Sequence, residues 1–266
     1  MHNNSGDGRT MYPQERQQAI VEIARTAERV AVSELAERFE VTSETIRRDL
    51  EALDRRGILR RVHGGAVVTQ RLSLVEPTLA DREPAHALEK NRIAQAALAH
   101  LPGGADGSMI LDAGSTITRL AALVPPGAAG TVVTNSLPAA AQLAGLEQLR
   151  VQLLGGRVRG VTQACVGPEP LARLANLRCD VAFVGTNGLT PRYGLSTPDH
   201  DEAAVKRAMI AAARKVVVLA DSSKVGVELL VSFAPSAAVD VLITDDGIAA
   251  ADRAAFAAAG VEVVIA

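Results

Sequence analysis

Short apolar segments alternate with longer amphipathic ones from residue 88 to the end of the sequence, and this alternation is the strongest constraint on the fold. Apolar residues recur at helical spacing in the segments 91–101, 116–124 and 201–214. Apolar strands separated by helices build a mostly parallel sheet covered on both faces. We therefore predict an α/β domain over residues 88–266. Its strands are expected at residues 109–112, 131–134, 151–154, 180–184, 216–220, 239–244 and 261–265.

The composition is consistent with this fold. Apolar residues make up 48% of the 266 residues and aromatic ones 2%, so the core must be packed from Ala, Val, Leu and Ile. The sequence has no uninterrupted apolar run of about 18 residues, and residues 1–14 contain no apolar signal segment. Cys165 and Cys179 are expected to be free thiols. We therefore expect a cytoplasmic protein with no membrane partner.

The N-terminal segment predicts three short helices and a hairpin. A helical pattern begins at Pro13, and a second short amphipathic stretch follows Ser33. Thr42 lies where the N-cap of a third helix should be, and that helix carries an apolar stripe at Ile46, Leu50 and Leu53. Two short strands, 58–62 and 66–68, are expected around the turn at residues 63–65. This is the layout of a winged helix-turn-helix domain. We predict that it spans residues 1–68 and is followed by a linker over residues 69–87.

The third predicted helix has two chemically different faces. Its apolar stripe faces the core, which leaves hydroxyl and arginine side chains at the N-terminal end that enters the major groove in helix-turn-helix proteins. The wing adds basic residues that can reach phosphates. A solvated charged face is the alternative, because acidic residues are interspersed and the balance over residues 9–71 is only slightly basic. The predicted DNA contacts are Ser43, Thr45, Arg47, Arg48, Arg60, Arg61 and His63.

Three predicted strands run directly into loops suited to an anion. A helix N-terminus with free N–H groups favours a phosphate, hydroxyls add donors, and an arginine can pair with the charge. The carboxyl ends of parallel strands share one edge of the sheet, where ligands of such folds bind. Ordinary turns and helix caps are the alternative for each loop. The candidate residues are Asp112, Gly114, Ser115, Thr116, Thr134, Asn135, Ser136, Gly156 and Arg157.

The segments VSELAERF (32–39), VTSETIRRDL (41–50) and LRRVHGGA (59–66) closely resemble the DeoR family of bacterial repressors. The resemblance implies that Thr45, Arg47 and Arg48 lie on the recognition helix. Thr42 stands where many members have Ser, which keeps a capping hydroxyl.

The resemblance continues to the end of the chain. The motifs DAGST (112–116), TNS (134–136), GG (155–156), EAAVK (202–206) and ADSSK (220–224) resemble the family's sensor domain, which is similar in fold to ribose-5-phosphate isomerase and glucosamine-6-phosphate deaminase. Members typically bind a sugar phosphate that weakens operator binding and switches on sugar catabolism genes. This implies effector contacts from Asn187, Lys206 and Lys224, although an exposed lysine is otherwise an ordinary surface residue. The segment LSTPD (195–199) resembles regulators of fructose utilisation, which implies an effector such as fructose 1-phosphate.

Two other function classes are compatible with parts of this sequence. A sugar-phosphate isomerase or deaminase with an N-terminal extension is the main alternative, because Asp112, Asp199, Asp201, Glu202 and Lys206 supply acid and base groups. Such an enzyme has no need for paired arginines on a recognition helix, so we predict no catalytic residue. An architectural DNA-binding protein with a degenerate sensor would ignore every metabolite. No nucleotide fingerprint and no metal-ligand spacing occur, so no cofactor or metal is predicted.

One small DNA-binding head buries too little surface for tight specific binding. We therefore expect a homo-oligomer on operator DNA, with a phosphorylated sugar as the effector. The predicted function is a DNA-binding transcription repressor of sugar catabolism genes. Effector and DNA should each lower the affinity for the other.

Overall fold

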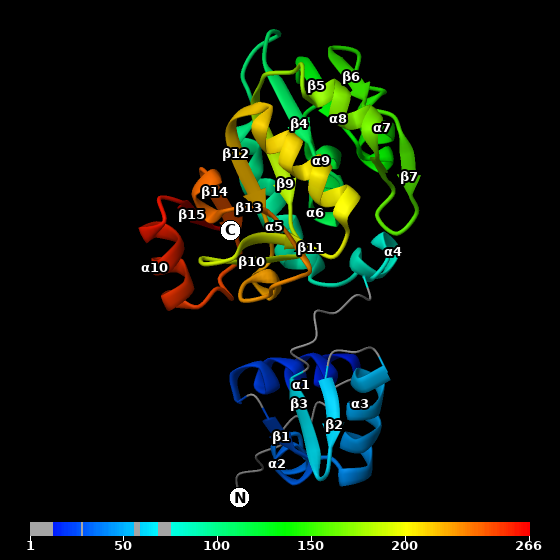
Figure 1. Ribbon diagram of the computed structural model, residues 1–266, viewed down its shortest axis with the longest axis vertical. Coiled ribbons are helices and arrows are strands. Elements are labelled where there is room, and N and C mark those ends of the chain that lie inside the picture. Colours follow the sequence, from blue (N-terminus) through cyan, green and yellow to red (C-terminus); the bar gives the residue numbers. More distant parts are fainter. Residues whose placement is uncertain (1–12, 28, 56–58, 69–75) are drawn as a thin grey trace, which may run out of the picture. The chain divides into compact units, whose positions relative to one another are not determined.

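The chain forms two units, residues 1–75 and residues 76–266 (Figure 1). The computed structural model describes residues 13–27, 29–55, 59–68 and 76–266. Part of the predicted linker, residues 69–75, and residue Ile58 of a predicted strand lie outside the described residues.

The first unit has the predicted helices and hairpin. Its helices are α1 (Pro13–Ala27), α2 (Val32–Arg38) and α3 (Ser43–Arg55), and its strands are β1 (Arg29–Ala31), β2 (Leu59–Val62) and β3 (Gly65–Val68). The strands form an antiparallel sheet in the order β1-β3-β2. Strand β1 was not predicted, because its three residues are too few to show an alternating pattern. The winged helix-turn-helix layout is confirmed.

The apolar stripe of α3 forms the centre of this unit. Ile46, Leu50 and Leu53 are buried, together with Ile20 of α1 and Leu35 of α2. Burying each such side chain contributes about 1.5–3 kcal/mol.

Local signals fix where α3 and the wing begin. The Thr45 N–H donates to Thr42 Oγ1 at 3.2 Å, which confirms the predicted N-cap. Gly65, at the start of β3, has no room for a side chain because a Cβ would lie 1.9 Å from the Val30 carbonyl oxygen. This close approach holds β1 against the wing.

The second unit is built on a seven-stranded sheet in the order β15-β14-β12-β9-β4-β5-β6, and every pairing in it is parallel. All seven predicted strands occur, with ends that differ by at most three residues. Their bounds are β4 (Ser108–Leu111), β5 (Gly130–Thr134), β6 (Leu149–Leu153), β9 (Cys179–Gly185), β12 (Ala213–Leu219), β14 (Val241–Thr244) and β15 (Glu262–Ile265).

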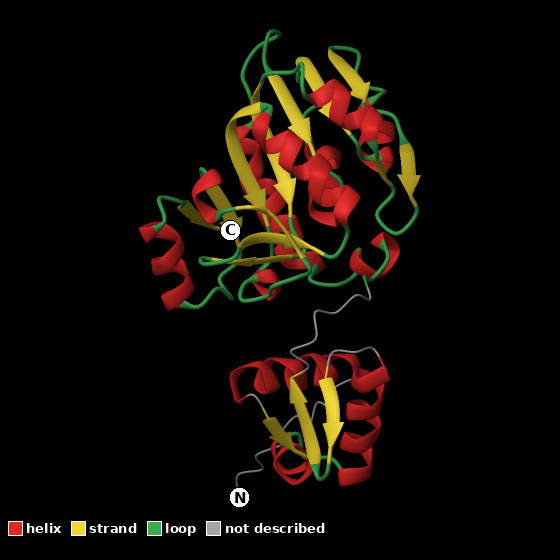
Figure 2. Ribbon diagram, viewed as in Figure 1, coloured by secondary structure: helices red, strands yellow, loops and turns green. Residues whose placement is uncertain are grey.

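Helices cover both faces of this sheet (Figure 2). On one face, α5 (Ala87–Ala97), α6 (Ser115–Leu123) and α7 (Leu137–Leu143) pack against alternate strand residues through Ile93, Leu120 and Leu143. On the other, α8 (Pro168–Leu174), α9 (His200–Ala211) and α10 (Ala250–Ala258) contribute Leu174, Met209 and Phe256. The predicted α/β architecture is confirmed.

Several short elements escaped the sequence analysis. They are the hairpin β7 (Arg157–Arg159) and β8 (Ala164–Val166), the antiparallel sheet of β10 (Gly188–Thr190), β11 (Gly194–Thr197) and β13 (Val231–Ala234), and the 3₁₀ turns 98–100, 222–224 and 236–238. Helix α4 (Leu79–Arg82) occupies a segment that we expected to be linker. Thr78 and Asp81 form a capping box there, and the Leu79 N–H donates to the Val161 carbonyl, so this segment belongs to the second unit. Cys165 and Cys179 are free and buried, as predicted.

The strand order contains a switch point. From the central strand β4 the chain adds β5 and β6 on one side, and then returns to place β9 on the other side of β4. The loops that follow β4 and β9 therefore diverge at the carboxyl edge of the sheet, where open α/β sheets bind ligands.

Candidate functional site

The N-terminal half of α3 presents the predicted DNA-contacting side chains to solvent. Ser43, Arg47 and Arg48 are exposed, and Thr45 is half-buried. Arg47 and Arg48 each lie 3.6 Å from a carboxylate oxygen of Glu44. Exposed ion pairs of this kind are worth about 0–1 kcal/mol, so they leave both arginines available to a phosphate or a base edge.

The opposite side of α3 is anchored by a buried ion pair. Asp49 accepts from Arg16 Nε at 2.6 Å and from Gln17 Nε2 at 3.0 Å, which ties α3 to α1. Asp49 is therefore not part of a solvated acidic face, as the alternative for this helix had assumed, whereas Glu44, Glu51 and Asp54 are exposed. One face of α3 is thus held against α1, and the other face is exposed to solvent.

The wing carries the remaining predicted contacts. Arg61 on β2 and His63 in the turn are exposed, and the Arg61 N–H donates to Asp54 Oδ1 of α3 at 3.2 Å. Arg60 lies on the same strand, but its side chain is outside the described residues.

At the switch point the structure brings together two predicted effector residues from distant parts of the chain. Lys206 of α9 donates a short hydrogen bond from Nζ to Asp112 Oδ2, which follows β4. The same ammonium donates to the Gly185 carbonyl at 3.0 Å, and the Gly185 N–H donates to Asp112 Oδ2 at 3.0 Å. Both side chains are buried, and the Lys206 Nζ lies 5.7 Å from the centre of the Phe233 ring. The carboxyl edge of the sheet thus carries a buried ion pair whose carboxylate and ammonium can hydrogen-bond a polar molecule.

The next predicted residues form the start of α6. Gly114 has a φ of 147°, which favours glycine, and no described side chain caps the helix. Ser115 and Thr116 follow and are buried. The first N–H groups of α6 therefore lack a side-chain cap, which is the arrangement that anion sites at helix N-termini use.

The loop after β5 uses its polar groups within the protein. Thr134 Oγ1 donates to the Leu111 carbonyl at 2.7 Å, Asn135 Nδ2 donates to the Cys165 carbonyl at 3.3 Å, and Ser136 Oγ accepts from the Ala139 N–H. These contacts join the ends of β4 and β5 and tie the loop after β5 to β8 and to α7.

The glycine turn after β6 is more exposed. Gly156 has a φ of 106°, and a Cβ there would lie 2.8 Å from the Val166 carbonyl oxygen. The Arg157 side chain is 63% exposed and pairs with Asp201 of α9 at 2.5 Å. The arginine is thus held beside α9 rather than inserted among buried groups.

A second buried charge cluster lies next to Lys206, and Asn187 is its only residue that was predicted as an effector contact. Arg159 of β7 pairs with Glu76 (2.6 Å), Asp199 (3.1 Å) and Glu202 (3.2 Å), and Asn187 Nδ2 donates to Glu76 Oε1 at 3.1 Å. Burial raises the pKa of Glu202, with Glu76 adding to the shift and Lys206 opposing it. The sequence contains one sign that Glu202 belongs beside the predicted effector residue Lys206. The two residues are one helical turn apart, so their side chains lie on the same face of the helix.

A third cluster is cationic and includes the predicted residue Lys224. Burial and the nearby Lys224 and Arg119 lower the pKa of Lys90, on α5, to about 8, against the opposing effect of Asp221. Lys90 Nζ donates to the Arg82 and Ala85 carbonyls, each at 2.6 Å. Asp221, which follows β12, is itself buried, but Lys224 and Ser223 hold its pKa below the ordinary value. Since α5 and α6 pack together and Lys90 senses the charge of Arg119 on α6, this cluster lies beside α6.

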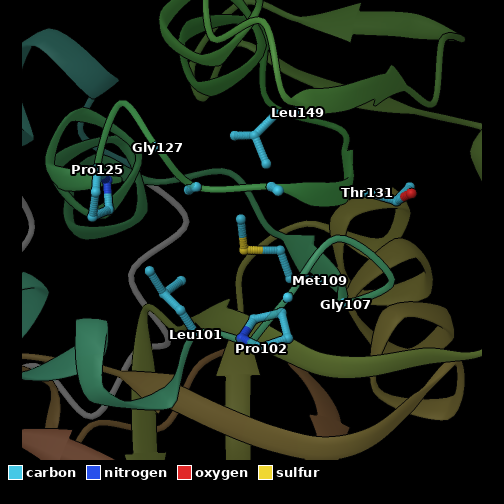
Figure 3. A pocket seen from close by; sticks show the side chains of 11 residues that line it. Leu101, Pro102, Gly107, Met109, Pro125, Gly127, Thr131 and Leu149 are labelled. Carbon is cyan, nitrogen blue, oxygen red and sulfur yellow. The ribbon is translucent and has the colours of Figure 1, made fainter.

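A pocket of about 210 Å³ lies at the other edge of the sheet (Figure 3). The pocket is lined by residues at the starts of three strands, Met109 of β4, Thr131 of β5 and Leu149 of β6. Leu101 points into the same space. Its lining contains no charged side chain, so it lacks the groups that would bind a phosphate.

Comparison with known proteins identifies the family. Residues 16–71 match the DeoR-like helix-turn-helix domain, and residues 85–246 match the DeoR C terminal sensor domain. The chain belongs to the DeoR family.

Full-length relatives agree with this assignment. The chain is 38% identical to the HTH-type transcriptional regulator GlpR of Haloferax volcanii, over 96% of this chain and 98% of the relative. It is 31% identical to the glycerol-3-phosphate regulon repressor of Escherichia coli, over 87% and 90% of the two chains. It is 34% identical to the uncharacterized HTH-type transcriptional regulator FruR of Bacillus subtilis, over 88% and 92%. Ribose 5 phosphate isomerase A from Neisseria gonorrhoeae aligns with a TM-score of 0.39 and 17% identity, over 53% and 54%.

This DeoR-family protein is therefore a DNA-binding transcription regulator with a sensor domain for a small molecule, and the enzyme alternative is not supported by its relatives. Among the described helices, none is long and apolar enough to cross a membrane.

Proposed function

We propose that this regulator represses sugar catabolism genes and that a phosphorylated sugar, such as fructose 1-phosphate, releases it from its operator. The observation that carries the proposal is the Asp112–Lys206 pair at the switch point, three residues before the uncapped start of α6. The Lys90–Lys224 cations, which lie near Asp221 at the end of β12, supply further positive charge. The names of relatives as a glycerol-3-phosphate regulon repressor and as FruR favour the same class of effector.

The phosphate would bind at the N-terminus of α6. Its N–H groups and the Ser115 and Thr116 hydroxyls supply donors, and Lys90 and Lys224 supply positive charge.

The sugar hydroxyls would bind the neighbouring polar groups. Asp112 accepts hydrogen bonds, Lys206 and Asn187 donate them, and Gly156 and Arg157 border this edge. Thr134, Asn135 and Ser136 would shape the loop that closes the sugar site. Loop shape of this kind sets which phosphosugar fits.

DNA would be bound by α3 and the wing. A homo-oligomer in the cytoplasm would place two copies of α3 in successive major grooves, with Ser43, Thr45, Arg47 and Arg48 toward the bases and Arg60, Arg61 and His63 toward the backbone. Effector binding would weaken operator binding, and by linkage the operator would weaken effector binding by the same factor.

The proposal is tested by thermal unfolding of the purified protein with a panel of sugar phosphates and their parent sugars. A ligand at about 100 times its Kd adds about 2.7 kcal/mol to the stability of the native state. We expect one phosphosugar to raise the melting temperature and its parent sugar to have no effect. Equal shifts with a phosphosugar and its parent, or no shift with any compound, would contradict a phosphate-dependent sensor.

The pKa of Lys90 predicts how this affinity depends on pH. Below a pH of about 8 Lys90 is charged in the free protein, and above it Lys90 is neutral. A bound phosphate dianion favours the charged form, so the complex holds more protons than the free protein above that pH. Affinity is therefore highest below the Lys90 pKa and should fall by about tenfold between about pH 7.5 and about pH 9.5.

The Lys90→Arg variant should remove most of this pH dependence, because arginine stays charged throughout the range. Lys215→Arg, on β12, is the matched control and should keep the wild-type profile. Titration calorimetry at several pH values provides the measurement. A wild-type profile in the Lys90→Arg protein would mean that another group titrates.

A further inference from the structure

The carboxylate of Glu76, the first residue of the second unit, occupies a site made of cationic and amide groups. Its side chain is only 4% exposed. Oε2 lies 2.6 Å from Arg159 Nη1, Oε1 lies 3.6 Å from Arg82 Nη1, and Oε1 accepts from Asn187 at 3.1 Å. We call Arg82, Arg159 and Asn187 the Glu76 cradle.

The cradle adjoins the proposed effector site. Arg159 also pairs with Glu202, one turn before Lys206 on α9. Asn187 lies two residues beyond Gly185, whose backbone contacts both Lys206 and Asp112. The Asp112–Lys206 pair and the Glu76 cradle are therefore linked through Glu202 on α9 and through the segment 185–187.

The hydrogen bonding of the cradle is incomplete. Within the described part of the chain, the Nε and Nη2 atoms of Arg82 are buried without a hydrogen-bond partner, whereas Glu76 Oε2 is held by its ion pair with Arg159. Such buried polar atoms cost about 1–3 kcal/mol each when unsatisfied. Glu76 also repels the Glu202 carboxylate, and this repulsion adds to the rise that burial causes in the pKa of Glu202. The buried Arg82 nitrogens of the cradle would thus gain hydrogen bonds if a ligand with more acceptor groups replaced the Glu76 carboxylate.

Glu76 also fixes the segment that follows the linker. Helix α4 begins three residues later, its Leu79 N–H donates to the Val161 carbonyl at 2.7 Å, and Arg82 of the cradle is its last residue. Figure 1 shows α4 beside the end of the β7–β8 hairpin that carries Arg159. Releasing Glu76 therefore loosens the point at which the chain enters the second unit.

We propose that Glu76 is an internal competitor of the effector: the hydroxyl groups of the bound phosphosugar displace its carboxylate from Asn187 and Arg159, and this displacement frees residues 76–82. The inference rests on the proposed function, because it assigns a regulatory step to that effector site. It makes Glu76 the link between ligand occupancy and the segment that leads to the DNA-binding unit.

The test compares the wild-type protein with the Glu76→Gln variant and a matched control, Glu147→Gln, an exposed glutamate after α7. Gln keeps the shape of the side chain but removes the charge that holds it to the arginines. Affinities for fructose 1-phosphate, fructose 6-phosphate and glycerol 3-phosphate are measured by calorimetry, and amide exchange is followed at Leu79 and Arg82. Melting temperatures show that each variant is folded.

Glu76→Gln is expected to bind whichever phosphosugar the wild type binds about five- to tenfold more tightly, and its Leu79 amide should exchange faster without any sugar. In the wild type that sugar should speed exchange at Leu79. A residue with a purely structural role would leave the affinity unchanged or lower it, and either result would overturn the inference while leaving the proposed function in place. If no compound binds any of the three proteins, the proposed function fails, and this inference fails with it.

Discussion

Replacing Arg47 and Arg48 together with alanine is expected to reduce the affinity for operator DNA by about 100-fold or more and to leave phosphosugar affinity unchanged. Both side chains are exposed on α3, and their only ion pairs in the described structure are the weak ones with Glu44. Each good arginine contact with a base or phosphate is worth about 1–3 kcal/mol, so the two losses together reach this range. Neither residue packs in the core, and the melting temperature should stay near that of the wild type.

The measurement is a fluorescence anisotropy titration with a DNA fragment that the wild-type protein selects from a randomised pool. Arg253→Ala, an exposed arginine on α10, removes one positive charge outside the DNA-binding unit and serves as the control. Undiminished binding by the double variant would mean that α3 is not the recognition helix.

Replacing Lys206 with methionine is expected to destabilise the second unit and to abolish the stabilisation by phosphosugar. Methionine fills a similar volume but leaves the Asp112 carboxylate, which is 1% exposed, without its cation. Breaking a buried pair by removing one partner costs about 3–5 kcal/mol, which corresponds to a fall in melting temperature of about 10 °C for a unit of this size.

The double variant Asp112→Asn with Lys206→Met separates pairing from packing. Because it removes both charges, it should recover part of the lost stability but not the sugar response. Lys215→Met, a half-buried lysine on the neighbouring β12 strand, should melt near the wild-type temperature. Scanning calorimetry follows all three variants. Wild-type stability in Lys206→Met would show that the Asp112–Lys206 pair does not stabilise the second unit.

The sequence predicted the sheet of the second unit because each of its strands is a compact apolar segment bounded by polar or glycine residues. The same holds for α3, where the Ile46, Leu50 and Leu53 stripe and the Thr42 cap are local signals. The three-residue strands β1 and β10 were missed because they are too short to establish a period.

The charge clusters were only partly predictable, for a different reason. Asp112 and Lys206 were each singled out from local motifs, but their direct pairing joins residues 94 positions apart. The contact between Glu76 and Asn187 spans 111 positions. No spacing rule in a single sequence connects such residues, because strand order brings them together. Glu76 was assigned to the linker for the same reason, since its polar surroundings in the sequence give no sign of burial.

The most direct test of the central claim is operator release in a single titration. Wild-type protein is bound to its selected operator fragment, and the phosphosugar that stabilises the free protein is added, followed in a separate titration by the parent sugar. We predict that the phosphosugar lowers operator affinity by about 5–150-fold and that the parent sugar leaves it unchanged. Operator affinity that does not respond to a phosphosugar bound by the same protein would contradict the account of this chain as an effector-released repressor.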